Sequence, residues 1–425
     1  MVVSLLKKLI SGSNNLYSDD ISQIIKNISK FSDISEDSDS IKNIIKAYEI
    51  GENAHGTQLR KSGEPYFTHC SKVGVILSEW NMDIDMIIAG LLHDSVEDTD
   101  LKLEEIEEHF NSDIKNLVDG VSKLSGMKFS SRKEQQAENF MKMFLSVAED
   151  IRVIIIKFAD RLHNLRTIDS LPLIKQRRIA NETKEIFSPL SHRLGMNNVK
   201  TEIDDLVLKI LDPKVYKHLQ KKVQSTKAQN DAIIEKFCEP LKVELKKYNI
   251  KSEVYGRVKN YSSIHKKMQK FNKQFNEIHD IFAIRIRVDK VEECYAALGI
   301  VHQLYTPIQE RFKDYIATPK GNGYQSIHTT VFGDDGKLVE VQIRTNKMDD
   351  TAEVGIAAHW IYKESSSTSD KELHGLNKHV SWLRELVENL QDEDRNPSEF
   401  FKILKIDLFQ DEIFVFTPNG DVVQL

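Results

Sequence analysis

The chain has 425 residues, of which 40% are hydrophobic and 29% are charged, and its formal net charge at pH 7 is −6. At ~150 residues per domain, this length predicts two or three domains. The composition excludes a collagenous, low-complexity or wholly disordered chain. No apolar run is long enough to cross a bilayer, and the N-terminus lacks the pattern of a secretory signal. The 3 scattered cysteines favour a reducing, cytoplasmic location over a disulfide framework or a zinc ribbon.

Charge is unevenly distributed along the sequence. Residues 94–119 contain ten acidic and two basic residues, whereas residues 209–273 contain seventeen basic and six acidic residues. An acidic segment suits cations and a basic segment suits phosphates, although such blocks are as often plain solvated helix faces. The asymmetry suggests that the two halves of the chain carry different chemistry.

The first half of the chain has helical periodicity. Residues 1–40 are rich in Ser, Asp and Asn and are expected to be peripheral, and the helical pattern then runs from about residue 41 to residue 211. Between residues 203 and 211 the apolar side chains recur on one helix face. Asp212-Pro213 should end that helix, because the residue before a proline avoids helical backbone angles.

The second half mixes strands with helices. Residues 338–345 alternate strictly, which places Glu340, Gln342 and Arg344 on one face of a strand. Residues 281–288 are also rich in strand-forming types. The last segment predicts a β-hairpin with Pro418 and Gly420 in its turn, and the chain stops inside that unit. We therefore expect an all-α region, then an α+β region, in a piece of a longer protein.

An imidazole and three carboxylates follow an apolar run at residues 86–92. If the helix continues, His93 lies over Glu97 and Asp94 over Asp98. A His-Asp pair is more often a capping or surface pair, but carboxylates beside a buried run are costly unless they are paired or bound to metal. The first pair could bind one divalent ion, with the second positioning an attacking water.

Further ligands of such an ion would come from other segments. His69 and Asp160 are the candidates, and Asn164 and Thr167 follow Asp160 on one helical stripe. Mixed nitrogen and oxygen ligation favours Mn, Fe, Zn or Mg over calcium, and the pattern does not choose among them.

A second group of residues suits nucleotides. Arg257, Lys259 and Lys267 could reach a polyphosphate, and Asp280 and Glu340 on neighbouring strands could hold Mg²⁺ for phosphoryl transfer. The loop at residues 320–328 presents Lys320, Tyr324 and His328, with Tyr324 as a possible stacking platform. Each feature alone is more often ordinary surface or turn chemistry, so the hypothesis rests on their convergence.

Seven segments resemble, in this order, the long RelA/SpoT-type guanosine tetra- and pentaphosphate synthetase/hydrolases. They are RKSGEPYFTH (60–69), LLHDSVEDT (91–99), KFADRLHNLRT (157–167), GRVKNYSSIHKKM (256–268), RFKDYIATPKGNGYQSIHTTV (311–331), VEVQIRT (339–345) and GIAAHW (355–360). The resemblance implies a multi-domain fold, with an all-α HD-type hydrolase domain followed by an α+β nucleotidyltransferase-like synthetase domain. The implied boundaries are an extension at 1–40, the hydrolase at 41–190, a helical linker at 191–230, the synthetase at 231–395, and a linker with the start of a TGS module at 396–425.

The resemblance also implies residue roles in the hydrolase. His69, His93, Asp94 and Asp160 would be ligands of a metal that is usually Mn²⁺. Glu97 and Asp98 would position the attacking water, and the guanosine pocket would be lined by Arg60, Lys61, Asn164 and Thr167.

In the synthetase, the ATP-side motif matches Arg257, Lys259, Ser263 and Lys267. Asp280 and Glu340 match the Mg²⁺-linked acids, with Glu340 as the activator of the 3′-hydroxyl. Tyr324 would stack on the acceptor guanine beside Lys320 and His328. The basic form of residues 311–314 suggests a bifunctional enzyme. Four residues depart from the family pattern without removing a proposed catalytic group: Cys70, Val258, Ser262 and His265.

The sequence therefore predicts a GTP/GDP pyrophosphokinase and a guanosine-3′,5′-bis(diphosphate) 3′-pyrophosphohydrolase in one chain. The expected partners are ATP, GDP or GTP, and (p)ppGpp, without a membrane or direct nucleic-acid binding. Ribosome association or regulation would come through the missing C-terminal region, and the two sites would be switched through the linker around residues 191–211. One alternative is a hydrolase whose second domain only senses nucleotide. An RNA-binding protein ranks last, because aromatic residues are sparse among the basic ones at 209–273.

Overall fold

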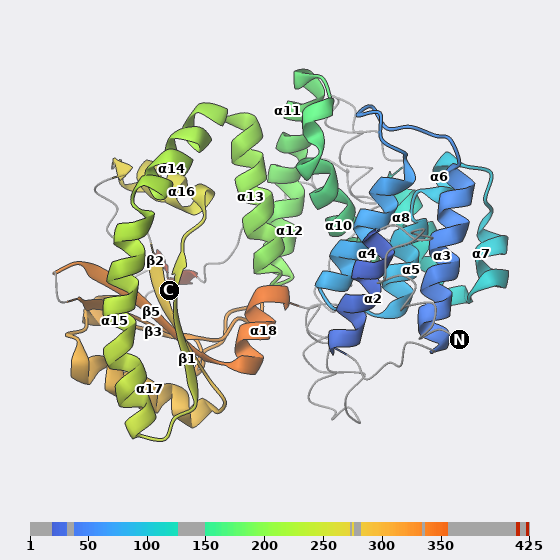
Figure 1. The fold of residues 1–425 in the computed structure, drawn as a ribbon. Coiled ribbons are helices and arrows are strands. Elements are labelled where there is room, and N and C mark those ends of the chain that lie inside the picture. Colours follow the sequence, from blue (N-terminus) through green and yellow to red (C-terminus); the bar gives the residue numbers. More distant parts are fainter. Residues whose placement is uncertain are drawn as a thin grey trace. The chain divides into compact units, whose positions relative to one another are not determined.

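The computed structural model describes residues 19–31, 38–125, 149–272, 274–275, 282–333, 336–355, 414–416 and 422–424. The chain divides into two compact units, one reaching Pro172 and the other running from Leu173 to Ile356. We call them the helical unit and the sheet unit, and each is described by itself (Figure 1). The predicted domain boundaries at residues 190 and 230 stay predictions.

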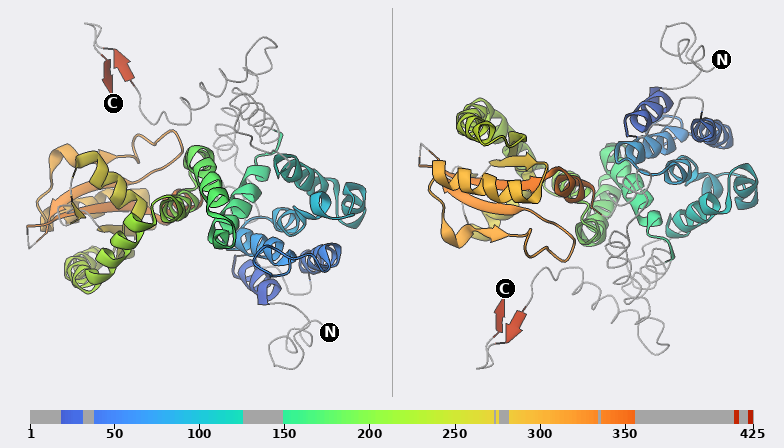
Figure 2. Two further views of the ribbon diagram at one scale, coloured as in Figure 1. Left: turned by 90° about the horizontal axis from the view of Figure 1, so that it is seen from above. Right: turned by 90° about the horizontal axis from the view of Figure 1, so that it is seen from below.

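The helical unit is built from helices around a central apolar pair, α4 and α5 (Figures 1 and 2). Asp83 begins α5, because its side chain accepts a 2.7 Å hydrogen bond from the backbone N–H of Met86. Every residue from Met86 to Leu92 is buried, as expected for a helix that is apolar all round. The helices of this unit are α2 (Asp19–Phe31), α3 (Asp39–His55), α4 (Phe67–Glu79), α5 (Ile84–Leu92), α6 (Ser95–Asp98), α7 (Leu103–His109), α8 (Ser112–Ser125) and α10 (Arg152–Arg166).

Helix α2 corrects the expectation that residues 1–40 are peripheral. Its isoleucine face is buried against α4, and the buried side chains are Ile21, Ile24, Ile25 and Ile28. Asp20 accepts hydrogen bonds of 2.6 Å from Ser71 and from Lys72 on α4. The expectation is therefore wrong for residues 19–31, because a polar composition concealed a one-sided apolar stripe.

The sheet unit begins with helices and ends with a mixed sheet. The helices before the sheet are α11 (Leu173–Glu182), α12 (Ser188–Arg193), α13 (Asn197–Leu211), α14 (Pro213–Ser225) and α15 (Lys227–Lys247), with a π-helical turn at Thr183–Phe187. The strands and their helices are β1 (Ser252–Val258), α16 (Tyr261–Phe271), β2 (Phe282–Val288), α17 (Val291–Leu304), β3 (Lys313–Asp314), β4 (Ile327–Phe332), β5 (Leu338–Thr345) and α18 (Asn346–Val354). The strand order is β1-β2-β5-β4-β3, and only β2 and β5 pair in parallel.

The two faces of this sheet differ in chemistry. Helices α15 and α17 pack on the apolar face and share its core with side chains such as Ile284 and Val341. The alternation of β2 and β5 turns the polar side chains to the other face, and the register places Arg285 opposite Gln342 and Arg287 opposite Arg344. A polar surface is thus built on a rigid apolar support.

Most predicted elements are confirmed within a residue or two. The strand predicted at 338–345 is β5, the one at 281–288 is β2, and α13 ends at Leu211 before Asp212-Pro213. The terminal hairpin appears as the antiparallel pair β6 (Phe414–Phe416) and β7 (Val422–Gln424), whereas its turn lies outside the described residues. The order of an all-α region before an α+β region is confirmed. Within the described ranges, no helix combines the length and the apolarity that a membrane crossing needs.

Candidate active sites

The helical unit brings the four predicted metal ligands together from separate segments. His69 lies in α4, Asp160 in α10, and His93 and Asp94 between α5 and α6. Nε2 of His69 lies 3.2 Å from Oδ1 of Asp160 and 3.7 Å from Oδ2 of Asp94, and Nε2 of His93 lies 3.2 Å from Oδ1 of Asp94. Donor atoms of His69, His93 and Asp160 all lie within 4.8 Å of one another. Two imidazoles and two carboxylates at this spacing can hold one divalent ion.

His93 provides the observation that best fits a bound cation. Its side chain is 0% exposed, and Nδ1 lies 2.8 Å from the carbonyl oxygen of Gly90, which can only accept. Nε2 therefore faces the cluster, where Oδ1 of Asp94 lies 3.2 Å away without the alignment of a hydrogen bond. Burial opposes protonation of His93, but the carboxylate of Asp94 outweighs it and raises the pKa to about 9. The same negative potential would favour a cation on Nε2, and a second-nitrogen bond to a carbonyl is typical of metal-ligating histidines.

The sequence predicted one continuous helix through residues 93–98, and this prediction is wrong for His93 and Asp94. Helix α5 ends at Leu92, and α6 starts only at Ser95. The carbonyl of Gly90, which Asp94 would use in a continuous helix, is taken by the ring of His93. The backbone N–H of Asp98 still donates to the carbonyl of Asp94, so Glu97 and Asp98 follow within one exposed turn. Burial, together with the charges of Asp94 and Asp98, raises the pKa of Glu97.

Three groups around the ligands were missed by the sequence analysis. Lys157 places Nζ 2.6 Å from Oδ2 of Asp160, and Tyr66 donates a 3.2 Å hydrogen bond to Asp94. His163 places Nδ1 2.7 Å from Nδ1 of His69. Burial, reinforced by His69 and Arg60, lowers the pKa of His163 to about 3, so its ring is neutral. For Lys157 and His163 the sequence did offer a signal, because each lies three residues from Asp160 and therefore near it on the surface of α10.

The predicted guanosine-pocket residues lie next to this cluster. Arg60 donates hydrogen bonds of 3.1 Å to Oδ1 of Asn164 and 3.3 Å to Oγ1 of Thr167. Asn164 in turn donates to Oδ1 of Asp160, which ties the pocket to a metal-ligand candidate. Lys61 is exposed. Three of the four predicted pocket residues are therefore connected to the ligand cluster through hydrogen bonds.

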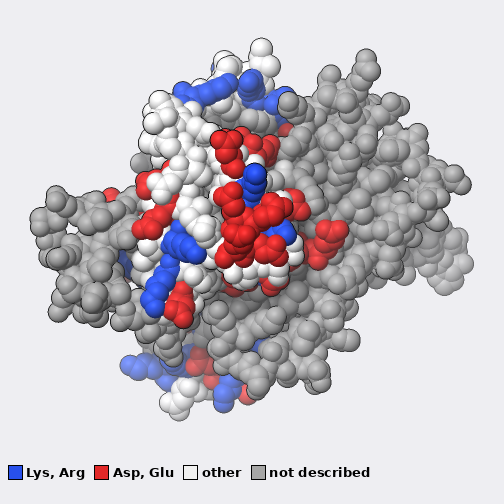
Figure 3. Space-filling view, turned by 90° about the vertical axis from the view of Figure 1, so that its right-hand side faces the viewer, with Lys and Arg blue, Asp and Glu red and all other residues white. Residues whose placement is uncertain are grey.

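The acidic block of the sequence is largely a solvated face. Acidic side chains gather in a patch on the face of the helical unit that carries α7 (Figure 3). The exposed residues that form it include Glu104, Glu105, Glu107, Glu108 and Asp113. Glu107 pairs with Lys115 at 2.5 Å. Exposed carboxylates are screened by water and salt, so the patch itself forms no ion site.

In the sheet unit, the polar face centres on Glu340 of β5. Lys259 donates a 2.8 Å hydrogen bond to Oε2, and Gln342 donates a 2.9 Å bond to Oε1. Burial acts to raise the pKa of Glu340, but Lys259 outweighs it, and the net shift is downward. Glu340 is thus ionised near neutral pH. The predicted partner acid, Asp280, lies outside the described residues.

The loop before β4 holds Tyr324 in a defined position. Its hydroxyl lies 2.8 Å from Nε2 of His328, whose Nδ1 lies 3.5 Å from Oε1 of Glu340. Burial lowers the pKa of His328 to about 4, so its ring is neutral and can accept a hydrogen bond from the Tyr324 hydroxyl. The ammonium of Lys320 lies 6.0 Å from the centre of the Tyr324 ring. These contacts connect all three predicted loop residues with Glu340.

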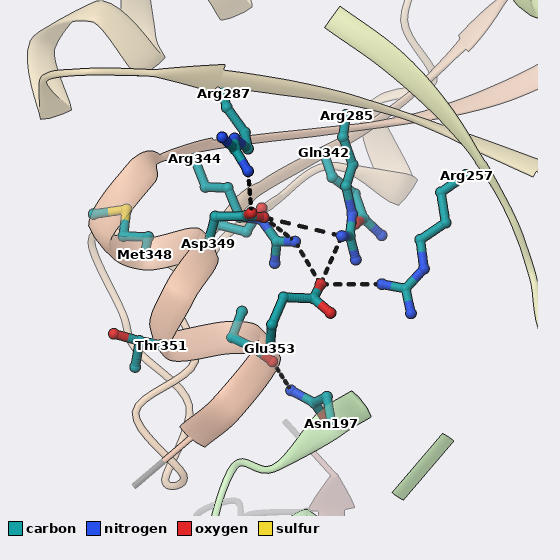
Figure 4. A network of polar contacts seen from close by, with 12 residues as sticks. Asn197, Arg257, Arg285, Arg287, Gln342, Arg344, Met348, Asp349, Thr351 and Glu353 are labelled. Atoms are coloured by element: carbon teal, nitrogen blue, oxygen red, sulfur yellow. Dashed lines mark hydrogen bonds and ion pairs between the residues drawn. The ribbon is translucent and has the colours of Figure 1, made fainter. Parts of the chain in front are cut away.

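The predicted ATP-side residues lie on β1, just after it, and on α16. Arg257 is at the end of β1, Lys259 follows it, and Ser263 and Lys267 lie four residues apart on α16. A network that the sequence analysis missed lies beside them, in which four arginines meet two acids of α18 (Figure 4). Its members are Arg257, Arg285, Arg287, Arg344, Asp349 and Glu353. The alternation of β2 and β5 was the sequence signal for the arginines of these strands, whereas no local sequence pattern indicated that Asp349 and Glu353 would contact them.

Comparisons with known proteins match the first and second parts of the chain to different families. Residues 47–197 match the family model described as an HD domain, and residues 256–367 match the region found in RelA / SpoT proteins. The chain is 47% identical over 385 residues to the GTP pyrophosphokinase of Myxococcus xanthus, covering 90% of this chain and 50% of that protein. It is 45% identical over 387 residues to the bifunctional (p)ppGpp synthase/hydrolase SpoT of Escherichia coli K12, covering 91% and 55%.

The chain thus spans about half the length of the curated relatives it matches. Among solved structures, small alarmone synthetase 2 from Bacillus subtilis matches 40% of this chain and 95% of its own, at 26% identity and a TM-score of 0.27. The HD domain implies the use of a divalent metal, in agreement with the cluster around His69 and His93.

Proposed function

We propose that this chain, which belongs to the RelA/SpoT-type proteins, both makes and breaks down guanosine 3′-diphosphates. In synthesis, the β,γ-pyrophosphate of ATP moves to the ribose 3′-oxygen of GDP or GTP, which gives (p)ppGpp and releases AMP. In breakdown, water attacks the 3′-diphosphate and regenerates GDP or GTP with pyrophosphate. The observation that carries this proposal is the presence of two separate polar sites, a cluster of imidazoles and carboxylates around Asp160 and a carboxylate paired with a lysine at Glu340. Relatives named as a pyrophosphokinase and as a synthase/hydrolase support it.

For breakdown, we assign the metal site to His69, His93, Asp94 and Asp160, with Mn²⁺ as the proposed ion. A divalent cation there would polarise the attacking water and neutralise charge on the phosphate. Glu97, whose raised pKa suits a proton acceptor, and Asp98 would orient and deprotonate that water. The guanosine would contact the pocket formed by Arg60, Lys61, Asn164 and Thr167.

For synthesis, Glu340 would accept the proton of the 3′-hydroxyl, and with Asp280 it would hold Mg²⁺. Tyr324 would stack on the acceptor guanine, supported by His328 and Lys320. The ATP phosphates would bind Arg257, Lys259, Ser263 and Lys267. Because Lys259 pairs with Glu340 in this structure, binding of a phosphate by Lys259 would release the carboxylate for its catalytic role.

A paired assay tests both halves in the same chain. Asp94→Ala and Glu340→Ala are each incubated with ATP and GDP, and separately with guanosine tetraphosphate, and the nucleotides are separated by chromatography. We expect Asp94→Ala to lose only breakdown and Glu340→Ala to lose only synthesis, each by on the order of 1000-fold. Asp100→Ala, an exposed acid near the first site, is the matched control and should retain both activities.

The same assay separates the proposal from its rival, a hydrolase with a nucleotide-sensing second domain. A sensor would form no AMP and no 3′-diphosphate with the unmodified chain. Metal binding has its own readout, because Mn²⁺ added to chelator-treated protein should raise the melting temperature, and less so in Asp160→Asn. Absence of AMP would refute synthesis, and a melting temperature indifferent to Mn²⁺ would refute the metal site.

The setting of the enzyme is also part of the proposal. It would act in the cytoplasm on ATP, GDP or GTP, and (p)ppGpp, and association with the ribosome would control it. Running both reactions together would only hydrolyse ATP, so the sites would be active alternately, switched through the helices around residues 191–211. A solution state with both sites fully active on saturating substrates would contradict that alternation.

A further inference from the structure

One carboxylate oxygen in the sheet unit joins three guanidinium groups. Oε1 of Glu353, in the last turn of α18, lies 2.6 Å from Nη1 of Arg285, 3.1 Å from Nη2 of Arg344 and 3.2 Å from Nη1 of Arg257 (Figure 4). These arginines come from three adjacent strands, β2, β5 and β1. Glu353 is therefore the point at which the arginines of the polar face meet.

The three arginines differ in their access to solvent. The side chain of Arg344 is 1% exposed and that of Arg285 is 9% exposed, whereas that of Arg257 is 37% exposed. Glu353 thus connects one accessible guanidinium to two buried ones. A guanidinium has five N–H donors, and Glu353 uses a single nitrogen of Arg257. The remaining N–H donors of Arg257 are not used by Glu353.

The charges of this cluster do not balance. Arg257, Arg285, Arg287 and Arg344 face Asp349 and Glu353, and the exposed Glu253 pairs with Arg287, so the seven groups sum to one positive charge. Burial, followed by the charge of Arg285, lowers the pKa of Arg257 although Glu353 acts in the opposite direction. The arginines therefore repel one another, and the excess charge suits an additional anion.

Helix α18 holds Glu353 in a fixed place. Thr345 begins the helix by accepting a 3.2 Å hydrogen bond from the N–H of Met348, and Asn197 donates a 2.7 Å bond to the carbonyl of Ala352 near its end. Asp349 lies one turn before Glu353 on the same helix face and binds Arg344 and Arg287. The two acids therefore share Arg344 and Arg285, Asp349 also binds Arg287, and Glu353 also binds Arg257.

We infer that Glu353 is a positioning residue for ATP in the synthetase. It holds the accessible Arg257 beside the buried Arg285 against their mutual repulsion, so that the guanidinium of Arg257 is in place for ATP. This inference rests on the proposed function of Arg257 on the ATP side. Without the carboxylate, Asp349 would still pair with Arg344 and Arg285, whereas Arg257, the most exposed of the three, would lose the ion pair that holds it and would move into solvent.

A competing interpretation assigns Glu353 the opposite effect. A carboxylate on Arg257 could act as an internal competitor of the ATP phosphates, and its removal would then tighten ATP binding. The two interpretations predict opposite signs for the same substitution, so one measurement decides between them.

The deciding variant is Glu353→Gln, which keeps the shape of the side chain and removes its charge. We expect the Kd of ATP, measured by calorimetry, and the KM for ATP to rise about 10- to 100-fold. The KM for GDP should change by less than about 2-fold, and breakdown of guanosine tetraphosphate should be retained. A merely structural role would lower the melting temperature and affect both substrates together, without this selectivity for ATP.

Two further variants complete the design. Glu353→Asp keeps the charge but is one methylene shorter, so its Kd for ATP should lie between those of the unmodified chain and Glu353→Gln. Glu253→Gln is the matched control, because Glu253 is 67% exposed and pairs with Arg287 rather than Arg257. An unchanged or lower Kd for ATP in both Glu353 variants would overturn the inference. Because ATP binding is measured without turnover, that result is distinct from a chain that forms no AMP, which would overturn the proposed function instead.

Discussion

The two candidate sites compensate charge in different ways. In the helical unit, His69, His93 and Asp160 are buried on or beside helices, and Nε2 of His93 has no hydrogen-bond partner among the described residues. In the sheet unit, the charged groups pair with one another, as Lys259 does with Glu340 and Arg257 with Glu353. The first site presents imidazole and carboxylate donors to a cation, although Lys157 pairs there with Asp160 at 2.6 Å. The second must exchange internal ion pairs for substrate contacts, so its activity should depend more on the packing that positions those pairs.

The largest effect should come from a backbone contact in the sheet unit. Gly355 follows α18 with φ of +62°, and a Cβ there would collide with backbone atoms of Leu194, Gly195 and Met196. Gly355→Ala should therefore destabilise the sheet unit by about 3 kcal/mol or more, and synthesis should fall sharply. Urea unfolding and the two activity assays measure this, and breakdown should be largely retained.

Gly299→Ala is the control for that substitution. A Cβ at Gly299 meets nothing within 4 Å and lies in the interior of α17, so the variant should be neutral or up to about 1 kcal/mol more stable. Equal losses of synthesis and breakdown in Gly355→Ala would break the distinction between the two sites.

The next effect concerns the orientation of a metal ligand. His163→Ala removes the ring that holds Nδ1 of His69 at 2.7 Å. Loss of such a partner should weaken Mn²⁺ binding and breakdown by about 10- to 100-fold. His163→Asn retains an amide near the position of Nδ1 and should recover part of the loss. Synthesis should not change, and an unaltered Mn²⁺ affinity in His163→Ala would show that His69 needs no such partner.

A third prediction concerns a buried carboxylate of the sheet unit whose charge is neutralised by two lysines. Buried Asp204 on α13 accepts hydrogen bonds from Ser188 on α12, Lys200 and Lys266 on α16. Asp204→Asn should lower the free energy of unfolding by about 1 to 3 kcal/mol at pH 7. Asp231→Asn, at an exposed position, should change it by less than about 0.5 kcal/mol.

The pH dependence of this effect has a defined sign. Burial acts to raise the pKa of Asp204, but Lys200 and Lys266 outweigh it and lower the pKa below its ordinary value of 3.8. A lowered pKa in the folded state contributes stability above the unfolded value, and this contribution is lost as the pH falls through the folded value. The difference between the unmodified chain and Asp204→Asn should therefore be full at pH 7 and 5 and shrink below pH 3.8. A difference that is larger at pH 3 than at pH 7 would contradict the assignment.

What the sequence could predict depended on the range of the interactions. The strand at β5 follows from alternation, and the end of α13 follows from a proline, because both are set by neighbouring residues. His69 and Asp160 were candidate ligands from their residue types and flanking patterns, and the family resemblance implied the same ligand set, whereas local spacing alone left their meeting open. The contact of Arg257 with Glu353 joins residues 96 apart, and the break after Leu92 depends on a side-chain bond to Gly90. Neither leaves a periodic signal in the sequence.

The smallest effect should come from the acidic patch over α7. Its carboxylates carry much of the charge asymmetry of the sequence, but they are exposed, unlike the buried ligands of the cluster. The triple variant Glu104→Gln, Glu105→Gln, Glu108→Gln should change the Kd of Mn²⁺ by less than about 2-fold at 0.15 M salt, where charges are screened within about 8 Å. Calorimetry at 0.15 M and 0.01 M salt measures this, and the effect should grow at the lower concentration. A change of about 10-fold at 0.15 M salt would mean that the patch helps to bind the ion, because screened surface charges could not produce it.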